Sequence, residues 1–171
     1  MDPTGIDFDD AVLGAGLPPA AEKALAEAGT LRGSDAVLAM ARLMTAQALA
    51  PGHPAVLIAF YRHHFYGHRL AAARDVARRA LAVGAEALGL PTVWREVRPA
   101  PLPDAMTSAR TRFYLFALKG YAYLSLRLDD PVEARDALAL LQALDPDDRV
   151  GGRVLETVRV RALVGDPEDE A

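Results

Sequence analysis

The chain of 171 residues contains no cysteine, and this absence excludes three kinds of chemistry at once. Without thiols there is no disulfide framework, no cysteine nucleophile and no metal site built on thiolates. Aromatic residues are scarce as well, at 6%, and Trp94 is the single tryptophan. The chain is nevertheless long enough for one domain with a continuous hydrophobic core that needs no covalent cross-links.

The sequence also lacks signals for export, membrane insertion and catalysis. Residues 1–10 are acidic and polar, without the basic start and apolar centre of a secretion signal. No apolar run approaches the roughly 18 residues that a bilayer-spanning helix needs. The three serines, Ser34, Ser108 and Ser125, lie in no nucleophile-elbow motif. We therefore expect a cytoplasmic protein that is not an enzyme and uses no cofactor.

What the sequence has in abundance is alanine, at spacings that predict helical hairpins. One set of small or apolar residues recurs at steps of four, three and five: Ala39, Leu43, Ala46, Pro51; Ala73, Ala77, Ala80, Ala85; and Ala134, Leu138, Leu141, Pro146. Residues three and four apart share one face of a helix, so each set forms a stripe. The first two sets are 34 residues apart, whereas the third starts 27 residues later than this period predicts. The delay indicates an insertion.

With this period, the chain resembles the tetratricopeptide-repeat superfamily over about residues 20–165. The resemblance implies an all-α superhelix of about three helical hairpins plus a C-terminal capping helix, because such units bury their apolar faces only by stacking. We divide the chain into a flexible leader (1–17), one repeat domain (18–165) with a Pro-rich insertion at about 90–104, and an acidic tail (166–171). The chain departs from the family pattern at Trp94, which falls in the insertion, and at Tyr61, where the middle unit expects a small residue.

Capping and breaker residues predict seven helices, at about 18–28, 35–49, 54–66, 69–88, 104–128, 131–144 and 149–163. Gly29 is expected to end the first helix, and Ser34 and Asp104 to cap the second and fifth. In the last helix the apolar residues Val150, Val154, Val158 and Leu163 are expected to cover the final hairpin.

Charge is distributed in blocks, although the net charge is only −4. Residues 55–127 carry eleven basic and four acidic side chains, whereas both flanking regions are acidic. Clustered positive charge attracts acidic partners. Because the total is acidic and no nucleic-acid-binding motif is present, we expect a protein or an acidic peptide as the partner, and neither nucleic acid nor a membrane.

In tetratricopeptide-like proteins the first helix of each unit lines a concave binding face. In the third unit this register turns Lys119, Tyr123 and Arg127 inward, at steps of four. The corresponding residues of the second unit are Tyr61, Arg62, Phe65 and Tyr66. Tyrosine and arginine are over-represented at binding hot spots, so these seven residues form the predicted partner site. The family's clamp for chaperone C-termini pairs lysine with asparagine, but this chain has no asparagine and places Tyr123 beside Lys119.

The Pro-rich insertion is a second candidate, with Trp94, Arg95 and Arg98 close together. Three roles are open to it: a plug across the groove, a docking loop that projects outward, or a cover for apolar surface between the second and third units. Loops of this length in compact domains are usually functional or disordered.

Two alternative functions remain open. His63, His64 and His68 could bind a metal or a small molecule, although Gly67 is expected to end the helix between His64 and His68, and we predict no metal site. The aromatic first helices could instead bury one another in a homodimer or larger homo-oligomer. The segments FYLFALKGYAYL and AVLIAFYRHHFYGHRL are also similar to small bacterial repeat proteins encoded among nitrogen-fixation genes.

Overall fold

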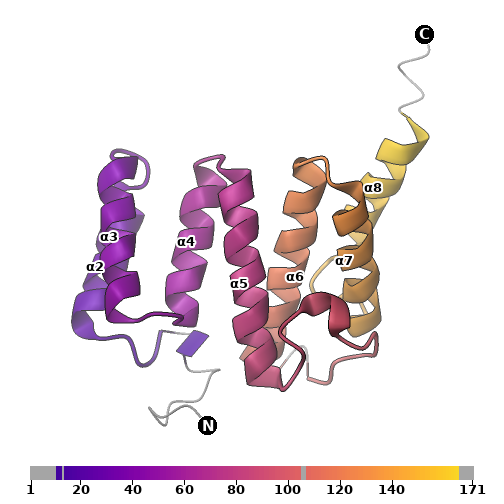
Figure 1. The fold of residues 1–171 in the computed structure, drawn as a ribbon, viewed down its shortest axis with the longest axis horizontal. Helices are drawn as coiled ribbons and strands as arrows, with labels where there is room; N and C mark the ends of the chain where they lie inside the picture. The colour runs from indigo at the N-terminus through magenta and orange to yellow at the C-terminus, as the bar shows by residue number, and fades with distance from the viewer. Residues whose placement is uncertain (1–10, 13, 105–106, 166–171) are drawn as a thin grey trace.

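The computed structural model describes residues 11–12, 14–104 and 107–165, and this part of the chain is helical without strands (Figure 1). Its helices are α2 (Pro19–Leu31), α3 (Ala36–Leu49), α4 (Pro54–Tyr66), α5 (Leu70–Leu88), α6 (Ala109–Arg127), α7 (Pro131–Leu144) and α8 (Arg153–Val164), with a short 3₁₀ helix η1 (Trp94–Glu96) between α5 and α6. Most of the predicted leader and the whole acidic tail lie outside the described residues.

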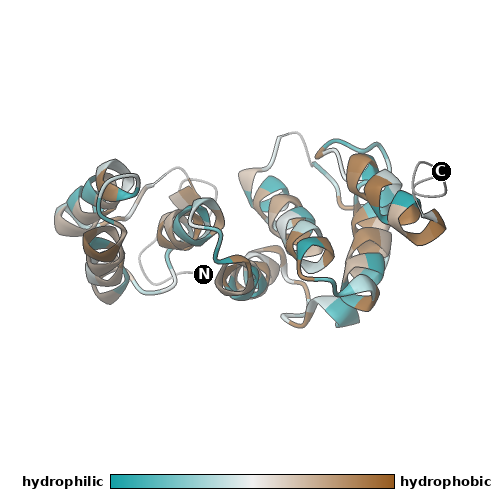
Figure 2. Cartoon of the chain, turned by 90° about the horizontal axis from the view of Figure 1, so that it is seen from above, coloured by the Kyte–Doolittle hydropathy of each residue, from teal (hydrophilic) through white to brown (hydrophobic). Residues whose placement is uncertain are grey.

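The helices form consecutive antiparallel hairpins, α2 with α3, α4 with α5 and α6 with α7, which follow one another along the long axis of the molecule (Figure 1). Viewed from above, the hairpins succeed one another as a stack, with α8 at its far end (Figure 2). The predicted all-α hairpin architecture is therefore confirmed.

The predicted small-residue stripes lie at the centres of these hairpins. Ala39, Ala73 and Ala134, the first members of the three stripes, are all fully buried on the second helix of their hairpin. Alanine at such positions lets two helix backbones approach closely because its side chain occupies little space. Where the middle stripe has Ala85 in place of proline, α5 extends to 19 residues, compared with 14 in both α3 and α7.

Local capping explains the helix boundaries and corrects three predictions. Gly29 lies inside α2, which continues to Leu31. The Asp35 side chain, not that of Ser34, accepts a hydrogen bond from the first turn of α3 (3.0 Å to the Leu38 nitrogen). Ser108 caps α6, whereas Asp104 has a left-handed backbone (φ 59°) in the turn before it.

The Pro-rich insertion packs against the outside of the hairpin stack. Trp94 and Val97 are buried, and Trp94 lies 5.6 Å from the Tyr121 ring. The Leu102 nitrogen donates to the Leu144 carbonyl (2.9 Å) at the end of α7. Trp94 therefore covers apolar surface of the α5–α7 region, while Arg95 and Arg98 of the same loop are exposed.

The last helix does not present the face that its sequence suggests. Val150 precedes α8 and is buried, and Leu155 is the buried residue within it. Val154, Val158 and Leu163, which were expected to cover the final hairpin, are more than half exposed. The physical reason is that α8 begins only at Arg153, so the helical phase places Leu155 on the packed face. In Figure 1 the C-terminal end of α8 stands clear of the other helices.

The core consists of two apolar clusters. One lies among α2, α3 and α4 with Val76 and Ala80 of α5 and Phe113 of α6. The other joins Ala77, Leu81 and Ala85 of α5 to α6, α7, α8 and the insertion. Tyr61 and Ala117 are partly buried and pack against both clusters. No helix in the described residues has the length and hydropathy that a membrane span requires.

Candidate partner-binding groove

A cavity of ≈ 590 Å³ lies between α4 and α6. Eighteen residues line it, mostly apolar or aromatic: Val12, Leu57, Ile58, Tyr61, Arg62, Phe65, Tyr66, Ala77, Ala80, Ala109, Arg112, Phe113, Phe116, Ala117, Lys119, Gly120, Tyr123 and Leu155. Its volume lies within the range of about 300–1,000 Å³ that is common for ligand sites. We call this cavity the groove.

The groove brings together residues that the sequence placed in two separate repeats. Tyr61, Arg62, Phe65 and Tyr66 from α4, with Lys119 and Tyr123 from α6, all line it. Arg127 does not line the cavity, but its guanidinium donates to the Tyr123 hydroxyl (2.7 Å) and lies 5.7 Å from that ring. Helical spacing predicts this arrangement because residues four apart share a face of α6.

An aromatic wall runs along α4 and crosses to α6. The Tyr61 and Phe65 rings stack at 5.8 Å, and the Phe65 ring lies 5.9 Å from that of Tyr123. Phe65 also meets Tyr66 edge-to-face at 5.5 Å. Such ring pairs form a stiff apolar surface that loses little side-chain entropy when a partner binds.

Gly120 allows the two helices to approach at the centre of the groove. A side-chain carbon added at Gly120 would lie 2.8 Å from the Tyr61 hydroxyl oxygen, so any larger residue would displace the Tyr61 ring. Burial, with smaller contributions from Tyr123 and Tyr66, raises the pKa of Tyr61 to about 12. Tyr61 therefore keeps its proton at neutral pH, and its hydroxyl can donate a hydrogen bond into the groove.

Three cations at the groove have no carboxylate partner within the described part of the chain. Arg62 is exposed and forms neither an ion pair nor a hydrogen bond there. The Lys119 ammonium donates to the Val150 carbonyl (2.7 Å), a neutral acceptor. Arg127, at the edge of the groove, donates to the Tyr123 hydroxyl, and no carboxylate of the described residues pairs with it. The groove therefore presents positive charge beside an aromatic wall.

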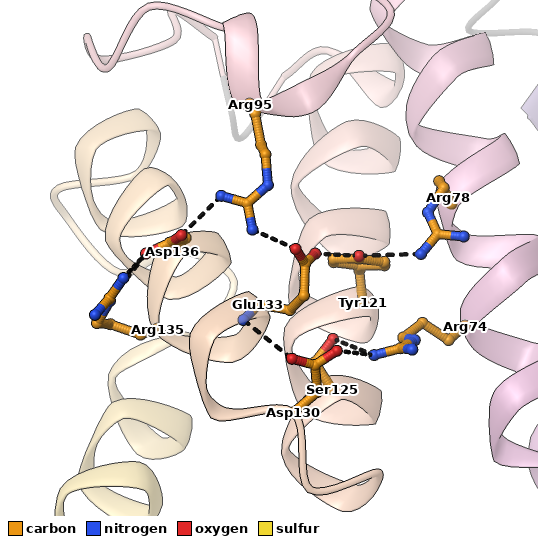
Figure 3. A network of polar contacts seen from close by, with 9 residues as sticks. All are labelled: Arg74, Arg78, Arg95, Tyr121, Ser125, Asp130, Glu133, Arg135 and Asp136. Carbon is orange, nitrogen blue, oxygen red and sulfur yellow. Dashed lines mark hydrogen bonds and ion pairs between the residues drawn. The ribbon is translucent and has the colours of Figure 1, made fainter.

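The arginines on the opposite side of α6 are paired with acids (Figure 3). Arg74 on α5 binds Asp130 (2.9 Å), and Arg95 from the insertion binds both Glu133 and Asp136 on α7. Tyr121 of α6 lies at the centre and donates to Glu133. We call this set the outer network. It connects α5, α6, α7 and the insertion.

Hydrogen bonds set the ionisation of the outer network. Burial alone would raise the pKa of Glu133, but donation from Tyr121 and Arg95 holds that pKa below its usual range. Hydrogen bonds from Arg95 and Arg135 likewise lower the pKa of Asp136. Both carboxylates are therefore charged at neutral pH and neutralise arginines of the basic block.

The histidine cluster does not converge on one point. The His63 ring is buried, and burial followed by Arg69 and Arg32 lowers its pKa. His64 accepts a hydrogen bond from Arg69 (3.2 Å), while His68 follows the helix end with a left-handed backbone (φ 57°). No group of three or more metal-ligating side chains forms among the residues that the structure describes.

Sequence reasoning missed several groove residues on α6. Phe116 lies one turn before Lys119, so extending the Lys119 stripe by one turn towards the N-terminus would have found it. Arg112 and Phe113 come one further turn upstream. Val12 from the leader carried no periodic signal, because it precedes the first predicted helix.

Comparisons with known proteins give one informative similarity. The chain is 42% identical over 115 residues to an uncharacterized 19.8 kDa protein in the nifW 5′ region of Azotobacter chroococcum mcd 1. The match covers 66% of this chain and 64% of that relative's length. The genetic region of the relative agrees with the similarity to proteins encoded among nitrogen-fixation genes. No family model and no solved structure matches the chain.

Proposed function

We propose that this chain is a non-enzymatic, tetratricopeptide-like interaction module, an adaptor or chaperone that binds an acidic segment of a partner protein in the groove. The observation that carries the proposal is the combination of an aromatic wall with the cations Arg62, Lys119 and Arg127, which have no carboxylate partners among the described residues. An acidic peptide with an aromatic or aliphatic anchor complements both features. Its carboxylates meet the cations, and its anchor covers the rings.

The repeat pattern supports the same reading. Residues at equivalent steps, Ala39, Ala73 and Ala134, are buried on second helices, which leaves the first helices α4 and α6 to face the groove. A rigid helical scaffold with side chains on regular elements holds a binding surface in a fixed geometry. The proposal also places this chain among nitrogen-fixation proteins, on the gene region of the Azotobacter relative and on the sequence similarity to proteins encoded among nitrogen-fixation genes.

The test is site-specific photo-crosslinking from the full chain in its native source. A benzoylphenylalanine placed at Phe116 reports on the groove, and one at Val132 on α7 serves as control, since both side chains are 54% exposed. We expect an acidic partner protein to be cross-linked from position 116 and not from 132. Combining Lys119→Ala, Tyr123→Ala and Arg127→Ala should abolish the product while leaving the helical circular dichroism unchanged. Equal products from both positions, or a product that survives the triple substitution, would contradict the proposal.

A homodimer is the second candidate, favoured by α8. Its exposed residues Val154, Val158 and Leu163 present aliphatic surface that a second copy would cover. Sedimentation equilibrium over a hundredfold concentration range should then show a dimer. The double substitution Val158→Asp and Leu163→Asp should return it to a monomer with unchanged helix content. A monomer at every concentration would exclude this alternative.

A further inference from the structure

The described part of the leader reaches the groove ahead of α2. Val12 is among the groove-lining residues, and both Val12 and Leu17 are partly buried against the N-terminal core cluster. The His53 ring holds this segment in place: its Nδ1 accepts from the Ala55 nitrogen (3.1 Å), and its Nε2 lies 2.7 Å from the Ala15 carbonyl oxygen. Because Nδ1 accepts, Nε2 carries the proton and donates to Ala15. One side chain thus caps α4 and ties the leader to the start of the groove.

Residues 1–10 combine acidic and aromatic side chains, which are the features proposed above for a ligand of the groove. Residues 1–10 read MDPTGIDFDD, with four aspartates and, close to them, the apolar side chains of Ile6 and Phe8. Phe8 is flanked by Asp7 and Asp9, which is the pattern of an aromatic anchor between carboxylates. Ten extended residues reach about 35 Å, which exceeds the length of about 28 Å for a 19-residue helix such as α6.

We propose that residues 1–10 are an internal ligand of the groove, which they occupy until the acidic segment of a partner displaces them. This inference rests on the proposed function, because it assigns a regulator to the same site. The aromatic side chain of Phe8 is chemically complementary to the aromatic wall, and the neighbouring aspartates are complementary in charge to Arg62 and Lys119. The leader therefore protects a cationic, aromatic surface from non-specific contacts and raises the affinity that a true partner must have.

Tethering makes even weak binding by the leader effective. A short flexible tether gives an effective concentration on the order of 1 mM. A leader segment whose free peptide binds with a Kd of about 100 µM would therefore weaken the apparent affinity for any competitor about tenfold. An effect of this size is readily measured.

The experiment uses a fluorescein-labelled synthetic peptide of residues 1–12 as the probe and full chains as receptors. The released variant carries Asp7→Asn, Phe8→Ala, Asp9→Asn and Asp10→Asn. A matched control removes three charges at the other end of the chain through Asp166→Asn, Asp169→Asn and Glu170→Gln. Fluorescence anisotropy should show that the released variant binds the peptide at least ten times more tightly than the natural chain. The C-terminal control should bind as the natural chain does.

Adding Arg62→Glu and Lys119→Glu to the released variant locates the binding. We expect this combined variant to lose the peptide, with helical circular dichroism unchanged. Equal affinity of the natural and released chains, or peptide binding that persists in the combined variant, would overturn the inference.

Photo-crosslinking from position 116 distinguishes this failure from failure of the proposed function. If the peptide binds no receptor while a partner still cross-links, the leader inference falls and the proposed function stands. If the peptide binds the released variant while no partner cross-links from either chain, the proposed function falls and displacement by a partner falls with it, whereas binding of residues 1–10 in the groove stands.

Discussion

The cations on the two sides of α6 differ in whether carboxylates pair with them. On the outer side, the insertion's Arg95 is held by Glu133 and Asp136, and Arg74 by Asp130. On the groove side, Arg62 and Lys119 have no carboxylate partner among the described residues. The outer cations therefore stabilise the fold, whereas the groove cations are available to an incoming ligand. In the outer network paired charge supports the fold, whereas in the groove the cations Arg62 and Lys119 are not matched by carboxylates of the described residues.

The largest expected effect comes from comparing two tyrosines of α6, one on the outer side and one on the groove side. Tyr121 is buried within the outer network, whereas Tyr123, two residues later, is partly exposed in the groove. Replacing Tyr121 by alanine should lower the free energy of unfolding by about 3–5 kcal/mol, because a buried ring and its hydrogen bonds are lost. Tyr123→Ala should cost about 1 kcal/mol or less and mainly weaken partner binding. Urea denaturation measures the first effect, and similar losses of stability in both variants would remove the distinction.

Reversing one charge on each side is the next test. Arg62→Glu in the groove should weaken binding of an acidic partner at least tenfold, which corresponds to about 1.4 kcal/mol. Arg98→Glu in the insertion makes the same charge change outside the groove and should leave affinity within about twofold. Both variants should retain the stability of the natural chain within about 0.5 kcal/mol. Calorimetric titration with the identified partner measures both affinities. Equal losses of affinity in the two variants would show that binding depends on the net charge of the protein and not on the position of Arg62.

Two buried hydroxyls provide a smaller test. The Tyr121 hydroxyl is bonded to Glu133 and Arg78, whereas that of Tyr114 is buried without a hydrogen-bond partner in the described structure. Tyr121→Phe should destabilise the fold by about 1 kcal/mol, and Tyr114→Phe should be neutral or stabilising by up to about 1 kcal/mol. Thermal unfolding compares them directly. A clear destabilisation by Tyr114→Phe would indicate that its hydroxyl has a partner.

The smallest expected effects concern the pH dependence of stability. His63 and Glu133 of the outer network should contribute to it in different pH ranges. The folded pKa of His63 lies below 6.5 because of burial and of Arg69 and Arg32, so unfolding favours its protonation. Its contribution to stability is complete above the unfolded pKa of about 6.5 and decreases as pH falls below that value. Glu133, whose folded pKa is also lowered, loses its contribution only at more acidic pH, as pH falls below its unfolded value of about 4.3. His63→Leu should therefore flatten the stability profile just below pH 6.5, and Glu133→Gln only under more acidic conditions.

The fold was predictable from sequence where local signals agreed. Pro54 and Pro131 begin α4 and α7, and the alanine stripes mark the buried faces, because capping and periodicity act over only a few residues. Six groove side chains, Tyr61, Arg62, Phe65, Tyr66, Lys119 and Tyr123, followed from the same periodicity. The outer network did not, since Arg95 meets Glu133 38 residues away and Asp136 41 residues away. No local pattern indicates which acids neutralise which part of a basic block.

The face of α8 was missed for a different reason. Val150 and Leu155 are both buried, but a turn containing Gly151 and Gly152 lies between them, so one helical phase cannot describe the whole segment. Gly152 is required there, since an added side-chain carbon would lie 2.6 Å from Leu141. Tertiary packing against α7 thus determines where α8 starts, and with it which side faces outward.

The division of the core into two apolar clusters has a consequence for how the molecule opens. The α2–α3 pair packs extensively on itself and only lightly on α4, so this hairpin can detach and re-form without disrupting the C-terminal cluster. Its backbone amides should exchange with deuterium well before those of α5 and α6. Tyr61 and Ala117 contact both clusters and lie along the groove. A ligand bound in the groove would contact both apolar clusters at once and so stabilise the one against the other. Its binding should therefore slow amide exchange in α2 and α3, although these helices lie away from the groove.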